Sequence, residues 1–251
     1  MQIKAIITDL DRTLLRTDKS ISEYTVGVLE QCRKKGILIL AASARPIRDV
    51  AEFGKIVRFD AAIATNGAVV DLPGKRLEYG IDNNTAEKEL ERLLTYRDVW
   101  LSVETDRGLF SDRDIPDWKP TVYGGFPKLP EGVLLYKIIA SSSEPSFYET
   151  AGNTLTRETY STVADKTLIQ IMSSDATKWK GVRQMLSHFG VDTENAVYFG
   201  DDNDDIEPIK NCGLGVAVAN AIPAVISAAD EIALSNDEDG VAVFLERVLK
   251  I

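Results

Sequence analysis

The chain has 251 residues, of which 44% are hydrophobic, and a formal net charge of −10. This length is enough for one large domain or two modest ones, and the hydrophobic fraction is enough for a sizeable core. The acidic balance argues against a nucleic-acid-binding protein, because binding to duplexes needs many Lys and Arg side chains to neutralise phosphates. A small anionic substrate needs only a few local cations, so that class of ligand is not excluded.

Targeting, cysteine and histidine patterns narrow the function further. The apolar run at the start is too short for a signal peptide, and no stretch reaches the ~18 apolar residues of a membrane span, so we expect a cytoplasmic protein that does not cross a membrane. Cys32 and Cys212 form no CxxC motif, which indicates free buried thiols in a reducing compartment. The single histidine, His188, is expected near a helix end on the surface, so acid–base chemistry must use carboxylates or lysine.

The first third of the chain alternates apolar strands with helices. Ser22 is a suitable N-cap for the first helix, Gly36 can end that helix, and Pro46 suits the first turn of the second. In chain order we expect a strand over 3–8, a helix over 20–36, a strand over 37–43, a helix over 46–57, and a strand with a turn at 66–67 over 60–71. Continuous apolar strands separated by helices indicate a parallel sheet covered on both faces.

The middle of the chain differs from both ends. It contains a helix over 84–96, strands over 99–105, 121–125, 134–142 and 167–174, and a short helix over 144–152. These strands alternate apolar and polar residues, as an antiparallel sheet with one solvated face does. The last third returns to the first style, with helices over 180–190, 205–213 and 240–249 and strands over 196–200, 214–220 and 231–235. We therefore predict an α/β protein whose doubly wound, Rossmann-like parallel-sheet core spans 1–82 and 171–251, with an α+β module inserted over 83–170.

Four groups of polar residues follow strands of the α/β halves, at the edge where such folds place their ligands. They are Asp9, Asp11 and Thr13; Ser43, Ala44 and Arg45; Lys178; and Asp201, Asp202, Asp204 and Asp205. Residues i and i+2 of an extended segment point the same way, so the carboxylates of Asp9 and Asp11 can face one spot. A hydroxyl and backbone N–H groups at a helix start suit an anion. Acidic oxygen ligands without His or Cys indicate Mg²⁺.

Each group also has an ordinary structural explanation. Two nearby aspartates often form a turn with a helix cap, Ser43 could cap the helix that starts at Pro46, and any lysine is solvated by default. The aspartates within 201–205 could simply lie at a helix N-terminus, where the helix dipole favours acidic side chains. These explanations weaken together, because all four groups are expected at the same edge of one sheet.

These motifs, in this order, resemble the haloacid-dehalogenase (HAD) superfamily, and within it the Cof-type phosphatases with a large α+β cap. DLDRT resembles the family's DxDxT motif, LILAASARP its second motif, and GDDNDD its fourth, and the tail with an Asn-Ala pair before Asp-Gly-Val also matches. Two lysines compete for the third motif. The family places that lysine 23 residues before the first aspartate of the fourth motif, and Lys178 rather than Lys180 has this separation from Asp201.

The resemblance implies a role for each matching residue. Asp9 would be the nucleophile that forms an aspartyl-phosphate, and Asp11 the general acid and then the general base. Mg²⁺ would be held by the Asp9 carboxylate, the Asp11 backbone carbonyl and Asp201, with Asp205 binding directly or through water. Ser43, the backbone N–H of Ala44, and Lys178 would hold the oxygens of the transferring phosphoryl group. The expected function is a Mg²⁺-dependent phosphatase acting on a small phosphorylated metabolite, for example a sugar phosphate.

The sequence departs from the family pattern in three places. The second motif reads Ser-Ala-Arg where the family has Thr-Gly-Arg; Ser43 keeps the hydroxyl, but Ala44 excludes glycine-only backbone angles. Asp204 replaces an asparagine and should weaken phosphate binding unless it is turned away or paired. Pro208 replaces a methionine, which we interpret as a variation in helix packing.

Other functions remain open at this stage. The same residues suit a phosphomutase acting on a hexose phosphate, or a phosphoacceptor switch of the response-regulator kind, although a switch needs neither Asp11 nor an inserted lid. A dinucleotide site rests only on a GLG sequence at 213–215 and is discounted. Substrate contacts are expected in the inserted module, where the candidates are Arg113, Lys119, Tyr123, Lys137 and Arg157. The sequence does not predict the oligomeric state.

Overall fold

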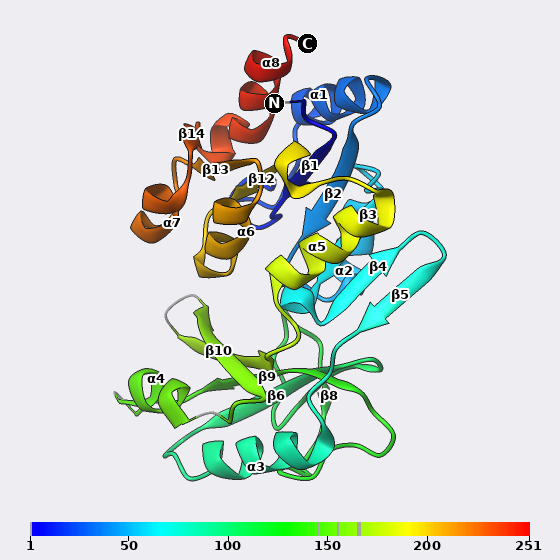
Figure 1. Ribbon diagram of the computed structural model, residues 1–251. Coiled ribbons are helices and arrows are strands. Elements are labelled where there is room, and N and C mark those ends of the chain that lie inside the picture. Colours follow the sequence, from blue (N-terminus) through cyan, green and yellow to red (C-terminus); the bar gives the residue numbers. More distant parts are fainter. Residues whose placement is uncertain (1, 145, 155, 165–166) are drawn as a thin grey trace. The chain divides into compact units, whose positions relative to one another are not determined.

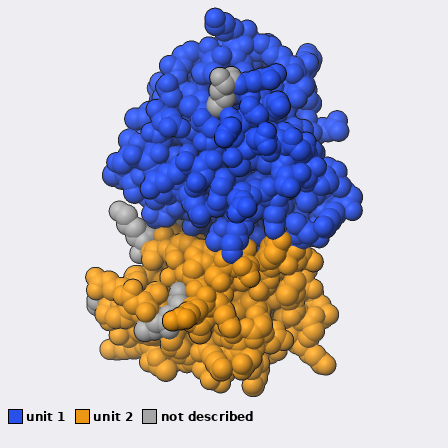
Figure 2. Space-filling view, viewed as in Figure 1, with its two compact units in different colours: residues 1–77, 177–251 blue, residues 78–176 orange. Residues whose placement is uncertain are grey.

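The computed structural model describes residues 2–144, 146–154, 156–164 and 167–251, and it divides into two compact units (Figure 2). Unit 1 comprises residues 1–77 and 177–251, and unit 2 comprises residues 78–176. The second unit is thus a continuous segment whose two ends both connect to the first.

The larger sheet has eight strands in the described residues, in the order β14-β13-β12-β1-β2-β3-β4-β5 (Figure 1). They are β1 (Ala5–Thr8), β2 (Leu38–Ala42), β3 (Ala61–Ala64), β4 (Val69–Leu72), β5 (Lys75–Glu78), β12 (Ala196–Gly200), β13 (Leu214–Val218) and β14 (Glu231–Ala233). The strands from β14 to β3 are parallel, and β4 is antiparallel to β3. β1 is buried along its whole length between β2 and β12, which explains its uninterrupted apolar sequence.

The helices of unit 1 pack against one another and against the sheet. They are α1 (Glu23–Lys34), α2 (Ile47–Phe53), α5 (Lys178–Phe189), α6 (Ile206–Asn211), α7 (Pro223–Ala228) and α8 (Gly240–Leu249). α1 packs against α8, whereas α6 contacts both α5 and α7. The predicted fold class, a doubly wound α/β core with an α+β insertion, is confirmed by this sheet and by the structural neighbours reported below.

Local sequence signals account for several helix ends in unit 1. The Ser22 side chain accepts a hydrogen bond from the backbone N–H of Thr25 at 3.0 Å and so caps α1. Gly190 has a φ of 65° and ends α5. Pro46 is the N-cap of α2 instead of lying in its first turn, so that helix begins one residue later than predicted. β5 and α7 were not predicted, because both are short and lack a clear apolar period.

Unit 2 contains a six-stranded sheet in the order β10-β11-β9-β6-β7-β8, counted over the described residues. Its elements are α3 (Asn83–Leu93), β6 (Trp100–Thr105), β7 (Gly108–Ser111), β8 (Thr121–Val122), β9 (Leu135–Ser141), α4 (Phe147–Thr150), β10 (Thr159–Ala164) and β11 (Leu168–Ser173). Neighbouring strands of this sheet pair antiparallel, except that β7 and β8 are parallel. The apolar core joins Leu90 and Leu93 of α3 to Val103 and Ile138 of the sheet. β7 and β10 were missed by the sequence prediction.

Two smaller predictions can be compared with the structure. Cys32 and Cys212 are both buried and free, as expected. No helix in the described parts of the chain is long and apolar enough to span a bilayer.

Candidate active site

The site begins where two neighbouring parallel strands end. The register of the sheet pairs Thr8 at the end of β1 with Phe199 near the end of β12, and the backbone N–H of Asp9 donates to the carbonyl of Phe199 at 2.9 Å. Asp9 and Asp201 therefore leave the sheet from adjacent positions, although they lie far apart in the sequence. Strand order, rather than any local feature, brings them together.

Asp9, Asp201 and Asp205 form a buried acid cluster. One carboxylate oxygen from each lies within 4.8 Å of the others, and the three residues are 5%, 4% and 0% exposed. The Nζ of Lys178, the first residue of α5, donates to Oδ1 of Asp9 and to Oδ1 of Asp205, both at 2.7 Å. Lys178 thus bridges two of the three acids. Lys180, the rival candidate, is exposed.

Asp205 has an extensive set of hydrogen bonds. Its Oδ1 also accepts from the hydroxyl of Tyr198 at 2.6 Å, while its Oδ2 accepts from the backbone N–H groups of Asp201 at 3.0 Å and Asp202 at 3.1 Å. A Cβ at Gly200 would lie 2.4 Å from the Cβ of Asp205, so only glycine permits this close turn. Asp205 therefore fixes both Lys178 and the loop that carries Asp201.

The electrostatics of the cluster favour a bound cation. Burial raises the pKa of Asp9 well above its usual value, with the charges of Asp205 and Asp201 adding to this and Lys178 opposing it. Burial and the charge of Asp205 raise the pKa of Asp201 to about 7. For Lys178, burial alone would lower the pKa, but Asp205 and Asp9 outweigh it and hold the pKa well above the ordinary value. Lys178 contacts two of the three acids, and the three carboxylates offer only oxygen ligands, which fits a hard divalent ion.

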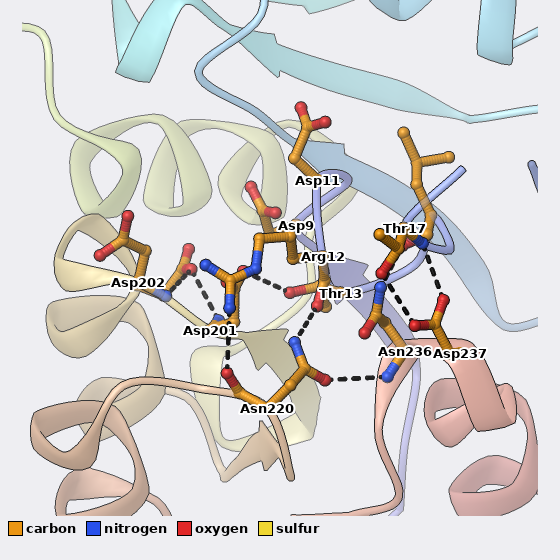
Figure 3. A network of polar contacts seen from close by, with 12 residues as sticks. Asp9, Asp11, Arg12, Thr13, Thr17, Asp201, Asp202, Asn220, Asn236 and Asp237 are labelled. Carbon is orange, nitrogen blue, oxygen red and sulfur yellow. Dashed lines mark hydrogen bonds and ion pairs between the residues drawn. The ribbon is translucent and has the colours of Figure 1, made fainter. Parts of the chain in front are cut away.

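Asp11 lies outside this cluster. Although alternate residues of an extended strand point the same way, the side chain of Asp11 points away from Asp9 and Asp201 (Figure 3). Arg45 donates to both of its oxygens, at 2.6 and 2.8 Å, and the Nζ of Lys19 donates at 2.8 Å. Burial would raise the pKa of Asp11, but the hydrogen bonds from Arg45 and Lys19 outweigh burial and lower it. We call Asp11, Lys19 and Arg45 the Asp11 clamp.

The second motif lies at the end of β2, the strand beside β1. Ser43 is buried, and its Oγ accepts from the backbone N–H of Arg45 at 3.1 Å, so this hydroxyl shapes the turn that carries Arg45. Ala44 is exposed and is not among the described residues with positive φ, so alanine fits this position without strain. The assignment of Ser43 and Ala44 to phosphate binding stays a prediction.

A turn after β3 supports the start of α5 and pairs Asp204. The side-chain amide of Asn66, which is 1% exposed, donates to Oδ2 of Asp204. The next residue, Gly67, has a φ of 113°, and a Cβ there would lie 2.4 Å from the carbonyl oxygen of Thr177. The unusual Asp204 is therefore hydrogen-bonded to Asn66, the condition under which we expect it to be tolerated near a phosphate. Pro208, the third departure, lies buried in α6.

The loop after Asp9 is fastened to the C-terminal part of the chain (Figure 3). The hydroxyl of Thr13 donates to Oδ1 of Asp201 at 2.8 Å. The backbone N–H and hydroxyl of Thr17 both donate to the carboxylate of Asp237 at 2.8 Å. In the tail that resembles the family, Asp237 therefore holds the loop after Asp9 in place. The contact of Thr13 with Asp201 likewise indicates that Thr13 stabilises this loop.

Sequence reasoning missed several residues that complete the site. They are Lys19, Asn66, Tyr198 and Asn236. Lys19 and Tyr198 act on partners within eight residues, whereas Asn66 and Asn236 act on partners distant in the sequence. Asn220 is the Asn of the Asn-Ala pair in the family-like tail, but the sequence does not predict its contact with Arg12. Only the Asn66–Gly67 pair carries a local signal, and that signal predicts a turn and nothing of its partner.

The candidate substrate contacts all belong to unit 2. Lys137 is buried on β9, where its Nζ donates to Gln170 at 2.9 Å. Arg113 is exposed and pairs with Asp112 at 2.9 Å. Lys119 and Arg157 are exposed, and the ring of Tyr123 packs against Phe126. A role for any of them stays a prediction. His188 is exposed in the last turn of α5, as expected.

Comparisons with known proteins agree with this geometry. The family model for haloacid dehalogenase-like hydrolases matches residues 6–245. Two curated relatives are 5-amino-6-(5-phospho-D-ribitylamino)uracil phosphatases. YitU of Bacillus subtilis (strain 168) is 26% identical over 268 residues, covering 98% of this chain and 97% of the relative. YbjI of Escherichia coli (strain K12) is 26% identical over 268 residues, covering 100% and 97%. The solved structure of TM0651 from Thermotoga maritima has a TM-score of 0.84 at 25% identity, covering 98% of this chain and 97% of that one.

Because the family model matches nearly the whole chain, the protein belongs to the haloacid dehalogenase-like hydrolases. Within that class it is a Cof-type member, as the resemblance implied, and it is a hydrolase acting on phosphate esters. Hydrolases of this class generally use a metal ion, and the buried acid cluster offers suitable ligands for one.

Proposed function

We propose that the protein is a Mg²⁺-dependent phosphatase that hydrolyses a small phosphorylated metabolite through an aspartyl-phosphate on Asp9. The observation that carries this proposal is the convergence of Asp9, Asp201 and Asp205 around one point, with Lys178 bridging Asp9 and Asp205. Such a cluster is costly to bury without a cation. The free buried cysteines support a reducing, cytoplasmic location.

Asp9 attacks phosphorus in the first half of the reaction. Its carboxylate lies at the end of β1, held at one oxygen by Lys178, so its orientation is fixed before substrate arrives. Asp9, Asp201 and the backbone carbonyl of Asp11 would hold Mg²⁺, with Asp205 acting directly or through water. When bound, the ion reduces the repulsion between the anionic nucleophile and the phosphate dianion.

Phosphate oxygens are held by the residues at the edge of this cluster. In this proposal, Ser43, the backbone N–H of Ala44, and Lys178 donate to the equatorial oxygens, and the charge of Lys178 is most useful when negative charge is spread over them. The hydrogen bond from Asn66 to Asp204 supports this arrangement, because it gives the extra carboxylate a partner.

Asp11 transfers the proton. It donates to the leaving alkoxide and later takes a proton from the water that attacks the aspartyl-phosphate. In the Asp11 clamp the carboxylate is held by Arg45 and Lys19, which favour its ionised form, so before it can act as an acid it must leave at least one of these partners and take up a proton from water. Unit 2, residues 78–176, would serve as the cap domain, for which the sequence predicts the narrower limits 83–170.

The test is a phosphatase assay over a panel of substrates, in Mg²⁺ and in EDTA. The panel contains hexose phosphates, nucleotides, pyridoxal phosphate and 5-amino-6-(5-phospho-D-ribitylamino)uracil, since two relatives bear the name of that activity. We expect release of phosphate that needs Mg²⁺, and its loss by at least ~10⁴-fold in Asp9→Asn, because removing a nucleophile removes the whole two-step route. Asp18→Asn, an exposed aspartate of the same loop, is the matched control.

Three results would contradict the proposal. Turnover by Asp9→Asn near the wild-type rate would show that Asp9 is not the nucleophile. Full activity in EDTA would show that the reaction does not need a metal ion. Conversion of a hexose phosphate into its isomer without release of phosphate would identify a phosphomutase instead.

A further inference from the structure

Arg12 occupies a position in the nucleophile loop where arginine is unfavourable. It lies between Asp11 and Thr13 with a φ of 60°, in the left-handed region that glycine adopts freely and most other residues avoid. A residue held in such a conformation beside an active site is a reason to ask what its side chain does there.

The guanidinium of Arg12 lies beside the acid cluster. Its Nε is 4.0 Å from Oδ2 of Asp201, the carboxylate whose other oxygen accepts from Thr13. The Arg12 side chain is 56% exposed, while that of Asp201 is 6% exposed. The solvated guanidinium of Arg12 therefore lies next to the buried carboxylate of Asp201, which we propose as a metal ligand.

The backbone of Arg12 is held by Asn220, whose side chain is in turn held by Asn236 (Figure 3). The side-chain amide of Asn220 donates to the carbonyl of Arg12 at 2.8 Å, and Nη2 of Arg12 donates to the carbonyl of Asn220 at 3.4 Å. Oδ1 of Asn220 accepts from the backbone N–H of Asn236 at 2.9 Å, and the amide of Asn236 donates to the carbonyl of Leu15 at 3.0 Å. The linked pair Asn220 and Asn236 thus holds the carbonyls of Arg12 and Leu15. In this arrangement the Arg12 side chain lies beside Asp201.

We propose that Arg12 sets the affinity of the acid cluster for its divalent ion. Its guanidinium supplies a positive charge to Asp201 when no ion is bound and opposes the ion when one binds, because both cations interact with the same carboxylate. This inference rests on the metal site of the proposed function. It assigns to Arg12 a positioning role: it acts on the metal through Asp201 and does not touch the substrate.

The size of the effect follows from exposure. A solvated charge a few ångströms from the ion is strongly screened, so we expect a change of about threefold to tenfold in the dissociation constant for Mg²⁺. For the same reason the change should shrink as ionic strength rises, since screening shortens the reach of an exposed charge.

The test is isothermal titration of the metal-free protein with Mg²⁺, at low and high salt, for the wild type and three variants. Arg12→Asn and Arg12→Gly remove the charge and tolerate the left-handed backbone, whereas Arg12→Lys keeps the charge. We expect the two neutral variants to bind Mg²⁺ about threefold to tenfold more tightly at low salt and Arg12→Lys to bind like the wild type. Arg247→Asn is the control, because Arg247 is also an exposed arginine beside a carboxylate, at 3.2 Å from Glu231.

A second readout is the rise in melting temperature caused by a fixed Mg²⁺ concentration, which should be larger in the neutral variants because tighter binding stabilises the folded state more. Equal or weaker Mg²⁺ binding by Arg12→Asn and Arg12→Gly would overturn the inference. So would equal tightening in Arg12→Lys, which would make the backbone, and not the charge, responsible. A wild-type protein that does not bind Mg²⁺ would instead overturn the proposed metal site itself.

Discussion

Asp9 and Asp11 lie two residues apart on one loop, yet their surroundings are opposite. Asp9 is buried among two other acids and one lysine, and burial raises its pKa. Asp11 is partly exposed between two cations, whose hydrogen bonds outweigh burial and lower its pKa. Both residues are aspartates, and their surroundings shift their pKa values in opposite directions.

This contrast matches the roles proposed for the two carboxylates. Burial and the neighbouring acids disfavour the charge of Asp9, so a bound metal ion would add to Lys178 in keeping this carboxylate ionised. The clamped carboxylate is ionised without metal, so its reactivity depends on release from its partners. The predictions below test each side of this comparison.

Among the tests of this comparison, the largest expected effect is on proton transfer by Asp11. Asp11→Asn keeps the size of the side chain but cannot give or take a proton, so kcat should fall by about 10²–10⁴-fold. The loss should be greater for an alkyl phosphate than for p-nitrophenyl phosphate, whose leaving group needs no proton. Rate measurements on both substrates check this. An equal loss on the two would contradict the acid role.

The buried cluster should be the more fragile region when the lysine is removed. Lys178→Met leaves Asp9 and Asp205 buried without their shared partner, so the free energy of unfolding in EDTA should fall by about 3 kcal/mol or more. Urea unfolding measures it. Lys180→Met, two residues along the same helix and exposed, is the control and should change stability by less than about 0.5 kcal/mol. Similar losses in both variants would mean that Lys178 is not the centre of the cluster.

The two regions should also respond differently to pH. The pKa of Asp201 is raised to about 7 in the folded protein, so between about pH 4 and pH 7 the folded state binds more protons than the unfolded state. Stability in EDTA should therefore fall as pH rises through that window, by up to about 1.4 kcal/mol per pH unit for one full proton. The pKa of Asp11 is lowered, so its contribution is lost only on acidification below that window.

Urea unfolding at pH 5, 6, 7 and 8 measures this slope. Asp201→Asn should reduce it, and saturating Mg²⁺ should reduce it in the wild type, because a bound cation keeps the carboxylate ionised. A metal-free protein whose stability increases from pH 5 to pH 8 would contradict the raised pKa of Asp201.

The smallest expected effect concerns Asp204, at the border of the cluster. Its charge acts on Lys178, and its carboxylate accepts from Asn66. Asp204→Asn removes one negative charge near the proposed phosphate position, so inorganic phosphate should inhibit about threefold more strongly. Competitive inhibition constants for phosphate in the two proteins test this. Weaker inhibition in the variant would show that Asp204 supports the loop more than it repels the ligand.

Local signals in the chain determine much of the fold. The apolar runs predict β1, β2, β3 and β12, and Ser22 and Gly36 mark the two ends of α1, where Ser22 caps the helix and Gly36 follows its C-cap with a φ of 79°. The segments that the sequence does not predict, β5, β7, β10 and α7, are short or carry weak periodicity, so their conformation depends on neighbours in the sheet or on packing. The position of Pro46 was also missed by one residue, because it is the N-cap of α2 and not part of its first turn.

The sequence by itself determined which residue types the site contains, because motif order and spacing already distinguished Asp9, Lys178, Asp201 and Asp205 from other acids and lysines. Only the tertiary structure decided their partners. The order of the parallel strands placed Asp9 beside Asp201. Gly200, which has no Cβ, allows Asp205 to approach the backbone of its own loop. The residue after Asp11, Arg12, has a left-handed backbone, and the side chain of Asp11 contacts Arg45 and Lys19. The physical reason is that pKa and contact depend on burial and on distant charges, which a linear spacing does not contain.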